Sequence, residues 1–123
     1  MIETVKRETA ERLKEKRWMG ETYFCWFQIG CEPGNEQWEL RRWIPAYHLW
    51  ITLPAPCLPE LQTEVNFDYL RAYFLHIHRD SIQLLQWTAE FYWSKFSSWL
   101  DSTHRSCEEL ARVWLWKQGK DPL

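Results

Sequence analysis

Ten tryptophans in a chain of 123 residues constrain this fold more than any other feature of the sequence. An indole ring buries a large area while its N–H still needs a hydrogen-bond partner, so tryptophan collects in cores and at the centres of interfaces. One core of this size cannot enclose all ten rings. The sequence therefore predicts that several tryptophans lie near the surface, where a partner would cover them.

Length and composition indicate a single domain over residues 1–123. The chain falls within the commonest domain size of roughly 100–150 residues, and its 46% hydrophobic content is typical of a globular protein. A formal charge of −2 argues against a surface that is basic throughout. The start of the chain lacks the apolar region of a signal peptide, and no apolar run is long enough to cross a bilayer. We therefore expect a cytoplasmic protein that does not contact membranes.

The cysteines are expected to be reduced. Cys25, Cys31, Cys57 and Cys107 show no CxxC spacing and no secretory context. Cys25 and Cys31 flank a predicted turn, so a disulfide between them is the alternative that we keep open.

Residues 1–19 are predicted to form a helix. Ile2, Val5, Thr9 and Leu13 follow one another at three- and four-residue steps, and charged residues fill the positions between them. Gly20 would end this helix.

Residues 21–53 are predicted to form a three-stranded antiparallel meander. From Tyr23 to Ile29 the pattern has a period of two, in which Tyr23, Cys25, Phe27 and Ile29 alternate with Phe24, Trp26 and Gln28. The Glu-Pro-Gly-Asn sequence at 32–35 supplies the residues of a tight turn. A return strand and a third strand after Pro45 complete the sheet. Its outward face is expected to carry Trp26, Trp43 and Trp50.

Residues 54–65 are predicted to form a stiff bend, neither central strand nor helix, because Pro54, Pro56 and Pro59 lack the backbone N–H. A helical half over residues 66–119, with two to three helices packed on the sheet, would follow and complete an α+β fold. Asn66 is expected to cap its first helix, although residues 69–77 also fit a strand.

The strongest periodicity predicts a helix over residues 81–100, capped by Asp80 and Gln83, that organises the core and buries Trp93. A last helix, ending at Gly119, would bury four residues: Cys107, Leu110, Val113 and Trp114.

Catalytic and cofactor signatures are weak. No serine stands in a Gly-x-Ser-x-Gly elbow and no glycines are spaced as a phosphate-binding loop, so we expect neither an enzyme nor a cofactor. A zinc site is conceivable only if a strand at 69–77 continued to residue 78 and placed two histidines side by side. Its ligands would then be His76, His78, His104 and Cys107, whose spacing matches no common zinc signature.

The sequence therefore favours a small non-enzymatic interaction protein, an adaptor, assembly factor or inhibitor, that docks through tryptophan-rich surfaces on another protein or on a second copy of itself. The residues expected to contact the partner are Trp43, Trp50, Trp87, Trp116, Arg41 and Arg42. The first alternative is a module that binds single-stranded nucleic acid on the aromatic sheet face beside Arg41 and Arg42. The second is a zinc-stabilised interaction module.

Overall fold

The computed structural model describes residues 3–18, 20, 22–30, 37–45, 47 and 51–120. It confirms the predicted α+β fold, with an N-terminal helix, a three-stranded antiparallel sheet and helices through the C-terminal half. The predicted helical half over residues 66–119 contains three helices, within the two to three expected, and one further short helix lies before it, inside the predicted bend. In chain order the elements are α1 (Arg7–Glu15), β1 (Phe24–Gln28), β2 (Trp38–Arg42), β3 (Thr52–Ala55), α2 (Leu58–Glu64), α3 (Phe67–Leu85), α4 (Ala89–Thr103) and α5 (Cys107–Lys120).

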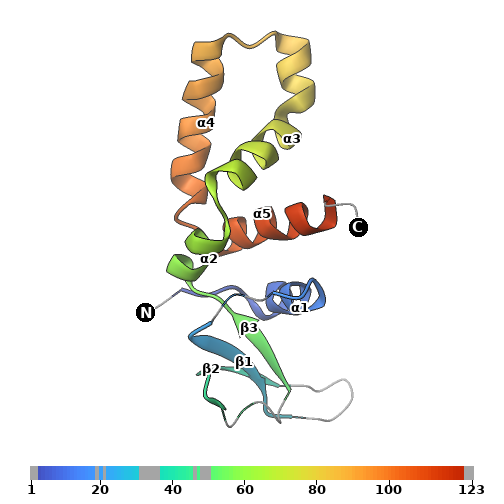
Figure 1. Cartoon of the computed structure of the whole chain (residues 1–123), viewed down its shortest axis with the longest axis vertical. Coiled ribbons are helices and arrows are strands. Elements are labelled where there is room, and N and C mark those ends of the chain that lie inside the picture. The colour runs from blue at the N-terminus through green and yellow to red at the C-terminus, as the bar shows by residue number, and fades with distance from the viewer. Residues whose placement is uncertain are drawn as a thin grey trace.

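The molecule is elongated, with the sheet at one end and a helical hairpin at the other. Figure 1 shows α1 lying over the sheet, α5 crossing next to it, and α3 and α4 extending away side by side. We call α3, α4 and the turn between them, residues 67–103, the arm.

The strand order is β2-β1-β3, so the sheet is not a simple meander. β1 is central and antiparallel to both neighbours, with Cys25 opposite Arg41 on one side and opposite Pro54 on the other. β3 returns to the far edge of β1 instead of pairing with β2. An edge strand tolerates Pro54, because a missing backbone N–H there need not break the ladder.

The predicted outward position of Trp26 is wrong. In the sheet Trp26 stands opposite Leu40 on β2 and Leu53 on β3, and its Nε1 donates a hydrogen bond of 3.0 Å to the carbonyl of Val5. The face that carries Trp26 is therefore covered by the N-terminal segment. Burial of Leu53 on this face fixes the register, because a strand that slipped by one residue would turn Leu53 to solvent.

The first helix begins at Arg7, later than predicted. Thr4 forms an isolated antiparallel bridge with Cys57, and Lys6 is the N-cap residue in extended conformation. The carbonyl of Val5 is the acceptor for Trp26, so the segment that precedes the helix is held by contacts distant in sequence.

The stretch predicted as a bend contains the end of β3 and helix α2. Pro59 lies in the first turn of α2, where the helix makes no use of a backbone N–H, so proline is compatible there. The Glu60 carboxylate accepts the N–H of Cys57 at 2.8 Å and, through its other oxygen, the N–H of Tyr23 at 2.8 Å. This side chain stabilises the start of α2 and ties it to the sheet.

The continuous helix predicted over residues 81–100 is wrong. α3 runs on through residues 81–85, so Asp80 lies within a helix and caps none. Gln86 takes a left-handed conformation with φ of 47°, which ends α3, and Thr88 caps α4 by accepting the N–H of Phe91 at 3.1 Å. Residues 69–78 are helical, and the predicted cap is confirmed, because Asn66 Oδ1 accepts the N–H of Tyr69 at 2.9 Å.

The core is organised by α5. The residues predicted to be buried in the last helix are buried, and Trp114 meets Trp18 edge to face with ring centroids 4.9 Å apart. Within α4, by contrast, Phe96 and Thr103 are buried while Trp93 is 49% exposed. The prediction that the 81–100 segment organises the core and buries Trp93 is therefore wrong. α5 instead contacts α1, α2 and α3.

Replacing Trp114 with alanine should destabilise the protein by about 3–5 kcal/mol, because it empties a buried ring site. Trp93→Ala, the matched control, should cost about 1 kcal/mol or less, because that ring is half exposed. Chemical denaturation of both variants measures the difference. Equal losses would contradict the assignment of the core to α5.

Candidate interaction surface

Aromatic rings hold the arm together. Phe74 on α3 is fully buried and contacts three rings of α4, with centroids 5.5 Å from Tyr92, 5.2 Å from Phe96 and 5.4 Å from Trp99. Among the described side chains of the arm, no hydrogen bond or ion pair joins α3 to α4. Ring packing is thus the main attraction between the two helices.

The arm also exposes large apolar side chains to solvent. Their exposed fractions lie between 40% and 50%: Phe67, Leu75, Ile77, Phe91 and Trp93. Isolated apolar residues on a surface are normal, whereas a contiguous group marks a place where another surface docks. The decisive question is therefore whether these residues share one side of the arm.

Some of the exposed apolar residues are linked across the two helices of the arm. On α3, Leu75 follows Phe67 by two four-residue steps, a rotation of about 80° around the helix axis. On α4, Trp93 and Leu100 lie on one edge, seven residues apart. A groove of about 440 Å³ is lined by Phe67 together with Leu100, and the rings of Phe67 and Trp93 both contact Phe96 at 5.6 and 5.9 Å. We call this surface, formed by Phe67, Leu75, Trp93 and Leu100, the arm face.

Two exposed apolar residues of the arm belong to other sides. Ile77 and Phe91 are each two residues away from a member of the arm face, and side chains two positions apart on a helix do not face the same way. Ile77 lines a groove that borders α5, and Phe91 contacts the ring of Trp87 at 4.9 Å. These two residues match Leu75 and Trp93 in exposure and helix while pointing elsewhere.

Of the predicted contact residues on the sheet, the structure describes Trp43, Arg41 and Arg42. Trp43 is 42% exposed, whereas Arg41 bonds Glu39 at 3.0 Å and lies over the Phe27 ring at 4.4 Å. The hydrogen bond to Glu39 raises the pKa of Arg41. Arg42 lies over the ring of Tyr23 at 4.5 Å, and Trp50 falls outside the described residues.

The predicted contact residues on the helices lie in two separate places. Trp87 is half-buried between the arm helices, where its ring meets Phe74 and His78, and its indole nitrogen is buried without a hydrogen-bond partner. Trp116 on α5 is half-buried beside Tyr73 and His76. Sequence reasoning missed the arm face, because helical periodicity assigned Trp93 to the core.

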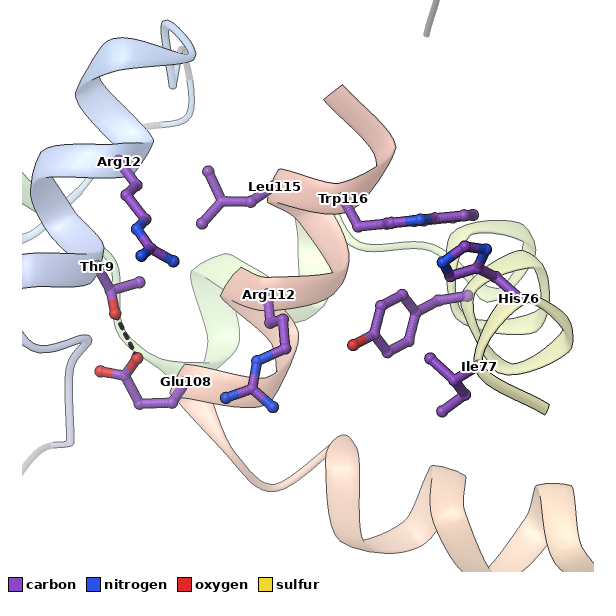
Figure 2. A pocket seen from close by; sticks show the side chains of 9 residues that line it. Thr9, Arg12, His76, Ile77, Glu108, Arg112, Leu115 and Trp116 are labelled. Atoms are coloured by element: carbon purple, nitrogen blue, oxygen red, sulfur yellow. Dashed lines mark hydrogen bonds between the residues drawn. The ribbon is translucent and has the colours of Figure 1, made fainter. Parts of the chain in front are cut away.

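The groove in Figure 2 lies between α1, α3 and α5 and has a volume of about 420 Å³. Arg12 and Arg112 reach into it from opposite helices, and the ring of His76 lies beside Trp116. The Glu108 carboxylate also lines this groove, and it accepts hydrogen bonds from the Thr9 hydroxyl and from the backbone N–H of Lys6, each at 2.5 Å. Both carboxylate oxygens are thus occupied in joining α1 to α5.

Replacing Glu108 with alanine should destabilise the protein by about 1–3 kcal/mol, because it removes the acceptor of the Lys6 N–H at the start of α1. Glu108→Gln keeps one acceptor oxygen and should lose less. Hydrogen exchange of α1 and chemical denaturation measure the two effects. Unchanged protection of α1 in Glu108→Ala would contradict this role.

The candidate metal ligands are not brought together. His76 lies beside Trp116, whereas His78 lies against Phe74, as expected for residues two apart on a helix. Within the described ranges, no group of three or more His, Cys, Asp or Glu residues is placed to hold a metal ion. The zinc alternative required residues 69–78 to be a strand, and α3 occupies them instead. The two remaining candidates, His104 and Cys107, lie at the end of α4 and the start of α5.

The described cysteines are free thiols whose surroundings favour the protonated form. Burial raises the pKa of Cys25 and of Cys57, and it raises the pKa of Cys107 to about 11. The Cys107 thiol contacts the carbonyl of Glu3 at 3.4 Å. Cys31 lies outside the described residues, and with it the predicted alternative of a Cys25–Cys31 disulfide.

The raised pKa of Cys107 predicts a loss of stability at high pH. The unfolded chain releases this proton near pH 9.0 and the folded chain near pH 11, so the stability gained from the buried thiol is complete below pH 9 and falls as the pH rises toward 11. The loss should be about 2 kcal/mol. Comparing wild type with Cys107→Ala at pH 7.5 and pH 10.5 isolates this contribution from other titrations. An equal pH dependence in both proteins would contradict it.

Comparison with protein-family models, curated proteins and solved structures found no match to this chain. In the part of the chain that the structure describes, no helix is long and apolar enough to span a membrane.

Proposed function

We propose that this protein is a small non-enzymatic interaction factor that docks on a protein partner through the arm face. The observation that carries the proposal is the exposure of Phe67, Leu75 and Trp93 on one side of a projecting helical hairpin, beside a groove. A partner that covers these side chains removes apolar area from water, which contributes about 25 cal/mol of binding free energy per Å². Interface energy concentrates in anchors of this kind, at about 2 kcal/mol or more for each large side chain truncated.

The chemistry of the other groove supports a role without catalysis. A side chain that acts as a general acid or base must present to the substrate an atom that can give up or accept a proton. Glu108 has both oxygens engaged by donors of α1, and the ring of His76 packs on Trp116 instead of on a nucleophile.

The sheet supports nucleic-acid binding less well than the sequence suggested. A stacking platform needs several exposed rings beside free cations. Trp26 faces the N-terminal segment, and Arg41 is paired with Glu39. Trp43 and Arg42 remain exposed, and we propose them as a smaller contact region for the same class of partner.

The proposal is tested by recovering complexes with tagged protein from nuclease-treated extracts of the source cells. The bait is wild type, Trp93→Glu or the matched control Phe91→Glu, since both rings are similarly exposed on α4. We expect wild type and control to recover the same protein in stoichiometric amount, identified by mass spectrometry as another chain or as untagged copies of this one. Trp93→Glu should lose it by at least about tenfold.

Equal recovery by all three baits would contradict docking through the arm face. A partner that is recovered from untreated extracts but not from nuclease-treated ones would instead favour the nucleic-acid alternative, as would affinity for single-stranded DNA that falls steeply with salt. Circular dichroism of each bait establishes that the substitutions leave the helices folded.

A further inference from the structure

We infer that the occupant of the arm face is a second copy of this chain, so that two arms pack into a four-helix bundle. This inference rests on the proposed function, because it uses the same surface. It starts from the shape of the arm, an antiparallel pair of helices of 19 and 15 residues, which is half of such a bundle.

Among its described residues the arm buries Leu70, Phe74, Phe96 and Thr103. Phe74 and Phe96 meet between the helices, while Phe67, Leu75 and Trp93 remain on one side with about half of their surface exposed. In a four-helix bundle the apolar stripe of each helix faces a shared core. A second arm laid on the arm face would supply this core.

The charge of the arm suits self-association. Residues 67–103 contain three basic and four acidic side chains, namely Arg71, Arg79, Lys95, Asp68, Asp80, Glu90 and Asp101. Two copies of a nearly neutral surface repel each other little. A partner selected by charge would instead require an arm of one sign.

The charges that border the arm face are also self-complementary. Arg71 lies between Phe67 and Leu75 on the edge of α3, and Asp101 follows Leu100 on α4, where it lines the groove with Phe67. Leu70 and Leu100 line the same groove, so Arg71 and Asp101 lie at similar heights on the arm. Among the described residues Arg71 has no ion-pair partner, and Asp101 pairs with the exposed Arg105 at 3.4 Å.

A two-fold axis parallel to the arm brings these charges together. Rotation about this axis sets α3 of one copy against α4 of the other, antiparallel, so Arg71 of each copy faces Asp101 of its partner. The same contact then forms twice, as in every isologous interface. Arg71 on α3 and Asp101 on α4 favour this arrangement over one that sets α3 against α3, where the two Arg71 side chains would face each other.

The first test is the mass of the purified full-length protein in sedimentation equilibrium over a range of concentrations. We expect a dimer for wild type and for the matched controls Ile77→Glu and Phe91→Glu. Leu75→Glu and Trp93→Glu should weaken association by at least about tenfold, because each places a charge in the apolar core of the interface. All four positions are exposed in the monomer, and circular dichroism checks that each variant folds.

The second test is rescue by mixing. Arg71→Asp and Asp101→Arg should each weaken self-association by about tenfold, because like charges then oppose each other twice. In a mixture of the two variants, the heterodimer has an opposite-charge pair at both contacts. Mixing should therefore restore dimers at concentrations where each variant alone is largely monomeric.

A wild-type protein that stays monomeric at the highest concentration reached would overturn the second-copy inference. The proposed function would then still be tested by whether the tagged protein recovers a different protein through the arm face. Dimers that persist in Trp93→Glu, or charge variants that mixing does not rescue, would likewise overturn this pairing of the arms. Loss of the recovered partner in Trp93→Glu but not in Phe91→Glu would still support the proposed function in those cases.

Discussion

The rest of the fold depends on the packing of one side of α5 against α1, α2 and α3. Leu110, Val113 and Trp114 lie at the centre of the core, where α5 meets α1, α2 and α3. The sheet reaches this centre through α1, and the arm reaches it through α3. Because α5 comes last in the chain, the core closes through contacts distant in sequence. Glu108 illustrates this, since it bonds the backbone of Lys6.

The elements that sequence predicted well are those with strong local signals. The alternation around β1 places Cys25 and Phe27 in buried positions, and Asn66 caps α3 through its own side chain. The failures share a physical cause. Apolar residues recur at helical steps across the α3–α4 turn, so periodicity cannot locate the break, which depends on the left-handed Gln86 and the cap at Thr88.

The proposed contact surface was harder to predict than the fold, because a helical pattern does not say which of two apolar edges is covered. Trp93 and Trp99 both fall within the apolar pattern of α4, yet Trp99 packs on Phe74 and Trp93 is half exposed. Their difference arises from the direction in which α3 lies, which is a tertiary property. The position of Trp26 was predicted wrongly for a related reason. The segment that covers it contains Val5, which lies far from β1 in sequence, so the local pattern of the strand does not reveal the contact.

The arm and the rest of the described chain are stabilised by different interactions, and this difference bears on function. Outside the arm, side-chain hydrogen bonds join segments far apart in sequence, as Glu60 does with Tyr23. In the arm, ring contacts join α3 to α4, and no hydrogen bond or ion pair links their described side chains. A region with few buried contacts and no crossing hydrogen bonds opens at lower free energy than the core does. A partner that covers the arm face would therefore stabilise the arm selectively, because binding to the closed hairpin shifts its local opening equilibrium.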